Sequence, residues 1–229
     1  MITVGDKEAM RNAAKMSLFV FANVFLGYKD VSPFTHKHII QALESPVTRK
    51  LICVPRGSLK SSLGCVAYPL WILLNNPNRR VLIDSELFTN STTFLREIRA
   101  HLESPLLTDI FGEFRTKTWN ETEIIVKQRT HPYKEASITV GGVGTTKVGQ
   151  HFDFIIGDDY NSPSNSNTPE KAQKVIDHYK YNLSILEPEG TYVIIGTRYS
   201  ENDLIGYILR EQLQVSGFPE TKLYTIKES

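Results

Sequence analysis

The sequence predicts an α/β fold in which helices cover both faces of a mostly parallel sheet. Four short, continuously apolar segments have the composition of buried strands, namely residues 51–54, 80–84, 154–157 and 192–196. Segments with helical spacing of apolar residues lie between them. Strands that are apolar on both faces and alternate with helices are typical of parallel sheets covered on both sides. Ligands of such sheets bind outside the carboxyl ends of the strands, so the residues after each strand carry the functional prediction.

Length and composition limit the classes of protein that the chain can represent. Its 229 residues, 41% of them hydrophobic, are enough for one large domain over residues 1–229 with a full core. The net charge of +1 indicates no strongly basic nucleic-acid-binding surface. Cys53 and Cys65 lie in apolar segments and are expected in the core. The histidines and cysteines show no metal-ligand spacing, and the apolar run 16–26 is too short to span a bilayer.

Periodicity and turn residues predict the individual elements. Pro69 is expected to kink or end its helix early, and Thr168 is expected to cap a helix whose first turn contains Pro169. In chain order, the expected elements are helices over 7–26 and 35–45, strand 51–54, a helix from 60 to about 74, strand 80–84, a helix over 90–102, strand-like segments over 123–127 and 136–140, strand 154–157, a helix over 169–186, strand 192–196 and a helix over 202–214.

The first buried strand is followed by "PRGSLKSS", residues 55–62, which has the context of a phosphate-binding loop between a strand and a helix. Lys60 and Ser61 fit the last two places of the G-x-x-x-x-G-K-[ST] pattern. Val54 and Leu59 stand where the two glycines are expected, and Gly57 between them can supply a left-handed turn. A plain strand-to-helix turn with an exposed lysine explains the segment equally well.

Two adjacent carboxylates, Asp158 and Asp159, follow the strand 154–157. Acidic side chains at the end of an apolar strand are costly to bury unless they bind a cation or polarise water. In phosphate-loop enzymes the first acid supports Mg²⁺ and the second orients the attacking water. The alternative is a turn with exposed acids, which the lysine-containing loop upstream makes less attractive.

The remaining strand-end segments carry weaker signals. "GTRYS" after strand 192–196 offers Thr197 and Arg198 to a terminal phosphate, or is a turn with an exposed arginine. Ser85 and Glu86 after strand 80–84 fit a helix-start pattern better. The glycine-rich segment 141–149 carries Lys147, which can act as a basic finger on a neighbouring subunit's nucleotide, touch DNA, or belong to a long hairpin.

Taken in order, "PRGSLKSS", "FDFIIGDD" and "VIIGTRYSENDLIG" resemble the ATPase domain of the large terminase subunits of tailed phages, which are DNA-packaging motors. The family's phosphate loop often begins Pro-Arg-Gly and departs from the ideal glycine spacing. The similarity runs from about residue 30 to 215, with "PFTHKHIIQALES" where the family places its adenine-side contacts. The resemblance implies a P-loop NTPase fold of the ASCE/RecA-like type, a three-layer sandwich.

The resemblance also implies a role for each matching position. Lys60 would bind the β- and γ-phosphates of ATP, with Arg56 along the phosphates. Ser61 and Asp158 would hold Mg²⁺, and Asp159 would be the catalytic carboxylate. Thr197 and Arg198 would belong to the segment that couples γ-phosphate loss to motion. The nucleotide-binding residues implied in this way are Pro55, Arg56, Gly57, Ser58, Leu59, Lys60, Ser61 and Ser62, with Phe34 and His36 near the base.

Two positions depart from the family pattern. Many members have Glu where this chain has Asp159, which is one methylene shorter. The segment before "FDFIIGDD" often carries arginines in the family, whereas here it has Lys147 and Gln150, with Arg129 as an outside candidate for a trans-acting finger.

By the same resemblance, we expect an ATPase domain that moves double-stranded DNA into a procapsid. The implied partners are the portal protein, a small terminase subunit and further copies in a ring of about five, although the isolated chain would be a monomeric, slow ATPase. Residues 1–30 would be a helical extension, and residues from about 200 to 229 a coupling or lid region leading to a nuclease domain outside this chain. The protein would act in the cytoplasm of a bacterial host, without a membrane.

Two other functions remain open from the sequence. One is another nucleic-acid-directed P-loop motor, such as a helicase domain. The other is a degenerate nucleotide-binding module without turnover, because Leu59 in place of a glycine can hinder the close approach of phosphate.

Overall fold

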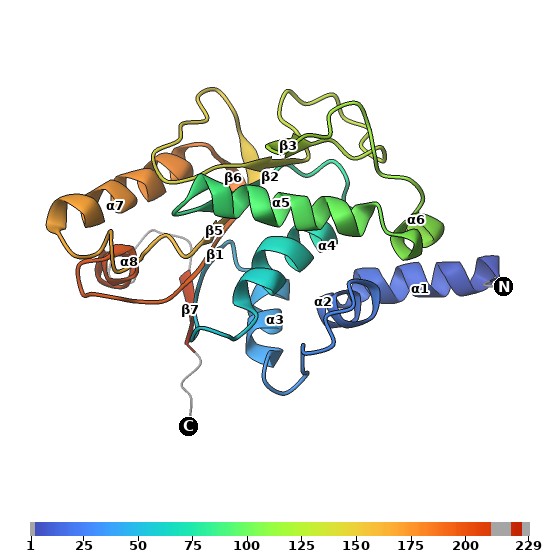
Figure 1. Ribbon diagram of the computed structural model, residues 1–229, viewed down its shortest axis with the longest axis horizontal. Helices are drawn as coiled ribbons and strands as arrows, with labels where there is room; N and C mark the ends of the chain where they lie inside the picture. Colours follow the sequence, from blue (N-terminus) through green and yellow to red (C-terminus); the bar gives the residue numbers. More distant parts are fainter. Residues whose placement is uncertain (1–2, 212–220, 226–229) are drawn as a thin grey trace.

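The computed structural model describes residues 3–211 and 221–225, which form a seven-stranded sheet with helices on both sides (Figure 1). The strand order is β3-β4-β2-β5-β6-β1-β7. Neighbours pair in parallel except β3 with β4. The strands are β1 Arg49–Cys53, β2 Val81–Ser85, β3 Glu123–Ile124, β4 Ile138–Val140, β5 Phe152–Asp158, β6 Leu186–Gly196 and β7 Thr221–Thr225. The predicted mostly parallel α/β sheet is confirmed.

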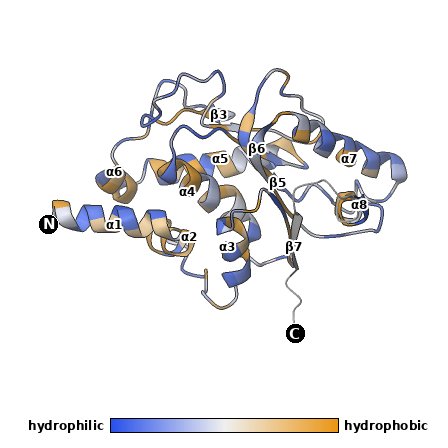
Figure 2. Ribbon diagram, turned by 180° about the vertical axis from the view of Figure 1, so that it is seen from behind, coloured by the Kyte–Doolittle hydropathy of each residue, from blue (hydrophilic) through white to orange (hydrophobic). Residues whose placement is uncertain are grey.

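Two hydrophobic cores lie on the two faces of the sheet, because successive side chains of a strand point to opposite sides. Ile52 of β1 and Val193 of β6 face a core that includes α3 Lys37–Glu44, η2 Ser62–Ala67, α4 Tyr68–Asn75, α5 Phe88–Leu102 and α6 Pro105–Phe111. Leu51 and Ile194 face the second core, which includes α7 Pro169–Ser184 and α8 Leu204–Glu211. Figure 2 shows α7 with hydrophilic residues along much of its outer surface. The result is the expected three-layer arrangement.

The connections place a crevice between β1 and β6. From β1 the chain passes to η2 and α4 on one face, and from β6 it passes to α8 on the other face. Adjacent parallel strands whose connections leave toward opposite faces open a crevice at their carboxyl ends, where ligands of α/β proteins bind. The segments after β1, β5 and β6 all reach this edge of the sheet.

The helix after β1 begins at Lys60 as predicted, and it changes register before Pro69. Residues Ser62–Ala67 form a π-helical turn, and α4 follows with Pro69 near its start. The helix therefore does not end early at Pro69, and its spacing changes from π- to α-helical just before the proline. Gly64 in this turn lets the helix approach β6, since a Cβ there would lie 1.9 Å from Ile195 Cδ1.

The amino-terminal helical segment contributes to the main core from Ala14 onward. The predicted helix 7–26 is divided into α1 Val4–Met16, α2 Leu18–Val20 and η1 Phe21–Phe25, because Ser17 is extended and caps α2. Leu18 and Phe21 are fully buried in the same core as Ile52. The part of this segment from Ala14 onward therefore packs against the same core as the sheet.

Other boundaries differ from the sequence prediction in understandable ways. Thr168 caps α7 as expected, and β6 begins at Leu186, several residues before the predicted strand. The short helix α6, capped by Ser104, was not predicted. The end of the predicted helix 202–214 lies outside the described residues. Within the described part of the chain, no helix combines the length and hydropathy needed to cross a bilayer.

Candidate functional site

The segment after β1 forms a compact loop whose backbone matches its place in a phosphate-binding motif. Gly57 and Leu59 both have left-handed backbone, with φ of 82° and 52°. Ser58 Oγ donates to Pro55 O at 2.8 Å and closes the turn. Leu59 therefore adopts the conformation that a glycine would allow at this position, while its side chain packs against the main core. Leu59 thus stands in place of the expected glycine without changing the turn.

Lys60 meets Asp159 at the centre of the site. Its ammonium lies 3.2 Å from Asp159 Oδ2, although the residue is only 7% exposed. Asp159 has φ of 40°, a left-handed conformation that Asp tolerates better than most residues. Backbone strain of this kind costs about 1–3 kcal/mol and is concentrated at functional sites. The two segments that the sequence singled out separately are thus brought together.

Ser61 and Asp158 form a second link between the same two segments. Ser61 Oγ donates to Asp158 Oδ1 at 2.8 Å, and the Cys65 thiol contacts the same carboxylate. Burial raises the pKa of Asp158 to about 6, partly offset by the bond from Ser61. A hydroxyl and a carboxylate are hard oxygen ligands, and Mg²⁺ usually binds one or two carboxylates together with phosphates and waters. The donor set fits a magnesium ion.

Two polar atoms beside this pair are buried and have no hydrogen-bond partner in the structure, Asp159 Oδ1 and Thr197 Oγ1. Gly196, the last residue of β6, lies against Asp159, and a Cβ at Gly196 would be 3.4 Å from Asp159 Oδ1. Buried polar groups are rarely left unpaired, because each costs about 1–3 kcal/mol. Both residues follow a strand at the carboxyl edge of the sheet, Asp159 after β5 and Thr197 after β6.

The segment after β6 contacts Arg56 of the loop after β1. Arg56 donates to Tyr199 Oη at 2.6 Å, and its guanidinium lies 5.9 Å from the Tyr199 ring centroid. Buried Asp203 fixes this segment by accepting from the backbone N–H groups of Tyr199 and Ser200. Arg198 is exposed and donates to Ser200 O, so it turns back onto its own segment. Tyr199, and not Arg198, thus makes the side-chain contact between this segment and the loop after β1.

A cavity of about 380 Å³ opens next to the phosphate loop. It is lined by loop residues 55–59 together with Asp30, Thr35 and His36. His36 is buried and its Nδ1 accepts from Ser32 N at 3.0 Å, which fixes the ring. Phe34 is 89% exposed and does not line the cavity. Of the two predicted base-side residues, only His36 lies in its wall.

Neither candidate for a trans-acting finger extends freely from the molecule. Lys147 is half-buried, which lowers the pKa of its ammonium, and its backbone N–H donates to Tyr181 Oη at 2.6 Å. Arg129 donates to Glu135 O and His131 O and stacks on Tyr133. Arg129 also lies near Arg80, at the amino ends of the strands, so it is at the opposite edge of the sheet from Lys60.

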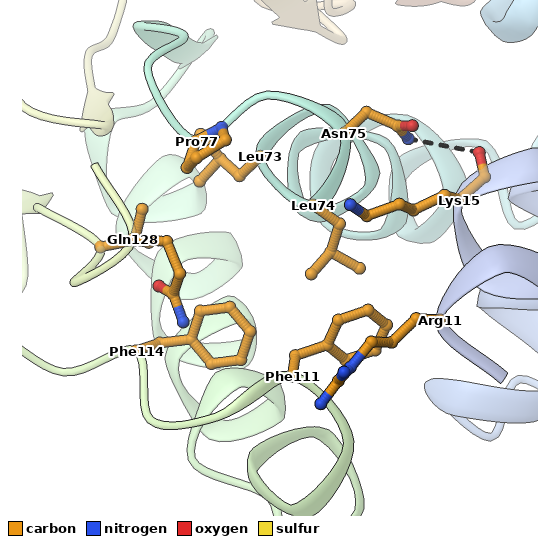
Figure 3. A pocket seen from close by; sticks show the side chains of 10 residues that line it. Arg11, Lys15, Leu73, Leu74, Asn75, Pro77, Phe111, Phe114 and Gln128 are labelled. Atoms are coloured by element: carbon orange, nitrogen blue, oxygen red, sulfur yellow. Dashed lines mark hydrogen bonds between the residues drawn. The ribbon is translucent and has the colours of Figure 1, made fainter. Parts of the chain in front are cut away.

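A second cavity, of about 230 Å³, lies far from the strand ends (Figure 3). Figure 3 shows Leu74, Phe111 and Phe114 around it, with Arg11 and Lys15 from α1 on one side. It lies at the far end of the helix that starts at Lys60, roughly 20 Å along that helix. Its lining is mainly apolar and contains none of the paired acids, so it is not part of the candidate site.

Several residues around the site were not singled out from the sequence. Tyr160 and Asp84 belong to a buried polar cluster beside Asp159, and Tyr199 and Asp203 hold the segment after β6. Asp84 at the end of a buried strand had the same signal as Asp158, a carboxylate after an apolar run. The pattern of a helix start in the residues that follow Asp84 obscured it.

Comparisons with known proteins support the fold. Neither a protein-family model nor a curated protein sequence matches the chain. Among solved structures, the large terminase of bacteriophage HK97 is similar with a TM-score of 0.57 at 13% identity, over 87% of this chain and 41% of that one. A variant of Saccharomyces cerevisiae Dbp5, bound to Nup159, a Gle1 variant, IP6 and ADP, is similar with a TM-score of 0.52 at 11% identity, over 91% of this chain and 52% of that one.

The chain therefore has the three-layer fold of P-loop ATPase-type proteins. It spans about half or less of the length of both solved structures. At these identities, the similarity concerns the fold alone.

Proposed function

We propose that the chain is a magnesium-dependent ATPase domain of a nucleic-acid motor. The observation that carries the proposal is the double link between the loop after β1 and the end of β5, Lys60 with Asp159 and Ser61 with Asp158. A cation-binding pair and a lysine–carboxylate pair side by side are what phosphoryl transfer to water requires.

The residues of this chain divide the work of binding and orientation. Lys60 and the backbone N–H groups of residues 57–61 bind the phosphates of ATP, and the cavity beside His36 receives the nucleoside. Ser61 and Asp158 hold Mg²⁺, which neutralises charge on the phosphates. Asp159 orients the attacking water and accepts its hydrogen bond, and Thr197 donates to the terminal phosphate. Arg56, steadied by Tyr199, lies along the phosphate chain.

The finer proposal is that this motor packages double-stranded DNA, as the ATPase part of a phage large terminase. Its support is the ordered set of three sequence segments and the similarity in fold to the HK97 terminase. In this role the chain works in the cytoplasm of a bacterial host, with a portal protein, a small terminase subunit and further copies in a ring of about five. In this role Asp159, one methylene shorter than glutamate, is the carboxylate that orients water, beside Lys60.

A second candidate is a different nucleic-acid motor of the same fold, favoured by the similarity to the ADP-bound Dbp5 structure. The two are separated by adding linear double-stranded DNA or single-stranded RNA to a phosphate-release assay with the purified chain. Stimulation by duplex DNA supports the packaging motor, and stimulation by RNA alone supports the second candidate. Binding of Mg-ATP without any turnover, with or without either polymer, identifies a nucleotide-binding module and overturns both.

A further inference from the structure

A buried polar cluster lies directly beneath the acidic turn, on the α7 side of the sheet. Its members come from β2, from the residue after Asp159, from α7 and from β6, and each is no more than 7% exposed. They are Asp84, Tyr160, His178, Asn182 and Tyr192. Buried polar clusters are costly unless every group is paired, so the bonding of this one is informative.

The Asp84 carboxylate accepts four hydrogen bonds. Its Oδ2 accepts from Tyr160 Oη at 3.1 Å, from His178 Nε2 at 2.6 Å and from Asn182 Nδ2 at 2.7 Å. Its Oδ1 accepts from Ser85 N at 3.1 Å. Three donors converge on Oδ2 and one reaches Oδ1, a set that suits an ionised carboxylate. Asp84 is therefore held at the end of β2 by three side chains from other elements.

Tyr160 connects Asp84 to the acidic turn at Asp158 and Asp159. Gly157 pairs with Asp84 in the sheet, and the Tyr160 ring folds back over Gly157, where a Cβ would lie 2.3 Å from the ring. The absence of a side chain at Gly157 is what allows Tyr160 to reach Asp84. Asp159 therefore stands between two anchored neighbours, Asp158 bonded to Ser61 and Tyr160 bonded to Asp84.

The glycine-rich segment 141–149 reaches the same carboxylate from the other side. Gly144 N donates to His178 Nδ1 at 3.4 Å, which places the proton of the neutral ring on Nε2, toward Asp84. Gly141 packs against Asp84 so closely that a Cβ would lie 3.0 Å from Oδ1. A continuous set of contacts thus runs from the glycine-rich segment through His178 and Asp84 to Tyr160.

We infer that Tyr160 is a positioning residue for Asp159, and that the Asp84–His178 pair connects this position to the glycine-rich segment 141–149. The inference rests on the proposed ATPase function and adds a regulation to it. A partner that displaces the glycine-rich segment shifts Asp84, releases Tyr160 and moves the carboxylate that orients water. Small misplacements of a catalytic group lower the rate more than they lower binding, so the connection acts on turnover.

The test replaces Tyr160 by Phe, which keeps the ring over Gly157 and removes only the hydroxyl. The matched control is Tyr68→Phe, another buried tyrosine whose hydroxyl makes a bond, to Lys50, outside the cluster. We expect Tyr160→Phe to lower kcat for Mg-ATP about tenfold or more, with KM changed less than about twofold. We expect Tyr68→Phe to leave kcat unchanged and the two melting temperatures to fall by similar amounts.

Hydrogen exchange of the amides of residues 142–149 gives a second readout. In the wild-type chain, Mg-ATP should change their exchange rates, and in Tyr160→Phe this response should be lost. Equal kcat in Tyr160→Phe and the wild type, or an unchanged exchange response in the variant, overturns the inference and leaves the ATPase proposal intact. A wild-type chain that does not bind Mg-ATP refutes both.

Discussion

The ammonium of Lys60 lies 3.2 Å from the carboxylate of Asp159, at the meeting point of the loop after β1 and the turn after β5. Phosphate and Asp159 therefore compete for the same cation. We expect Asp159→Asn to tighten ATP binding a few-fold, because an ion pair with one partly exposed partner contributes about 0.2–1 kcal/mol. Titration with a fluorescent ATP analogue measures the effect.

The control for this prediction is Asp177→Asn, an exposed acid on α7 that bonds only Gln173 in the described part of the chain. Its affinity for the nucleotide should equal that of the wild type. Weaker binding by Asp159→Asn would show that Asp159 supports the nucleotide itself and does not compete with it.

Thr197 carries a buried hydroxyl without a partner, so its removal should separate stability from activity. Thr197→Val keeps the shape and removes an unpaired group that costs about 1–3 kcal/mol. We expect the free energy of unfolding in urea to rise by about 1 kcal/mol while phosphate release falls at least tenfold. A variant that loses stability and keeps its activity would show that the hydroxyl has a structural partner.

Leu59 has left-handed backbone, with φ of 52°, which an L side chain adopts at a cost of about 1–2 kcal/mol. Comparing Leu59→Gly with Leu59→Ala isolates this cost, because both variants lose the packed side chain. The glycine variant should be the more stable by about 1 kcal/mol in urea unfolding. At exposed Lys174, inside α7, Lys174→Ala should instead be more stable than Lys174→Gly, by about 1 kcal/mol in urea unfolding. If the alanine variant were the more stable at both positions, residue 59 would not have left-handed backbone in solution.

Lys50 provides a prediction on pH and stability away from the site. Burial lowers the pKa of this lysine to about 8, and its ammonium bonds Leu43 O and Tyr68 Oη. The unfolded lysine titrates near pH 10.4, so between about pH 8 and 10 the unfolded chain binds more protons and stability rises with pH.

Lys50→Met removes this buried charge and should raise the free energy of unfolding near pH 7 by about 1 kcal/mol. Its advantage over the wild type should shrink as the pH is raised from about 8 to 10. Urea unfolding at both pH values measures the difference. An advantage that is constant with pH would show that Lys50 keeps its ordinary pKa in the folded chain.

The fold followed from sequence because strands such as 51–54 and 192–196 are apolar on both faces, which only a covered sheet accommodates. The pairing of Lys60 with Asp159 followed in outline, because parallel strands bring their carboxyl ends to one edge. The boundary at Ser17 and the π-helical turn before Pro69 did not follow, because both depend on packing against the sheet.

The contacts around the acidic turn after β5 were least predictable. Tyr160 is bonded to Asp84 on a neighbouring strand, and Tyr199 is bonded to Arg56, so both depend on tertiary contacts that no local pattern encodes. For Lys147 the glycine-rich segment left a basic finger, a DNA contact and a long hairpin open. The structure adds that the backbone N–H of Lys147 donates to Tyr181 of α7, a contact that no local pattern encodes.

Phosphate release from Mg-ATP by the purified chain, measured beside Lys60→Ala, Asp159→Asn and the surface control Lys174→Ala, tests the central proposal most directly. The proposal predicts turnover in the wild type and in Lys174→Ala, and its loss in the two site variants while all four chains remain folded by circular dichroism. Turnover that survives Lys60→Ala would contradict the assignment of the loop after β1 as the phosphate-binding loop.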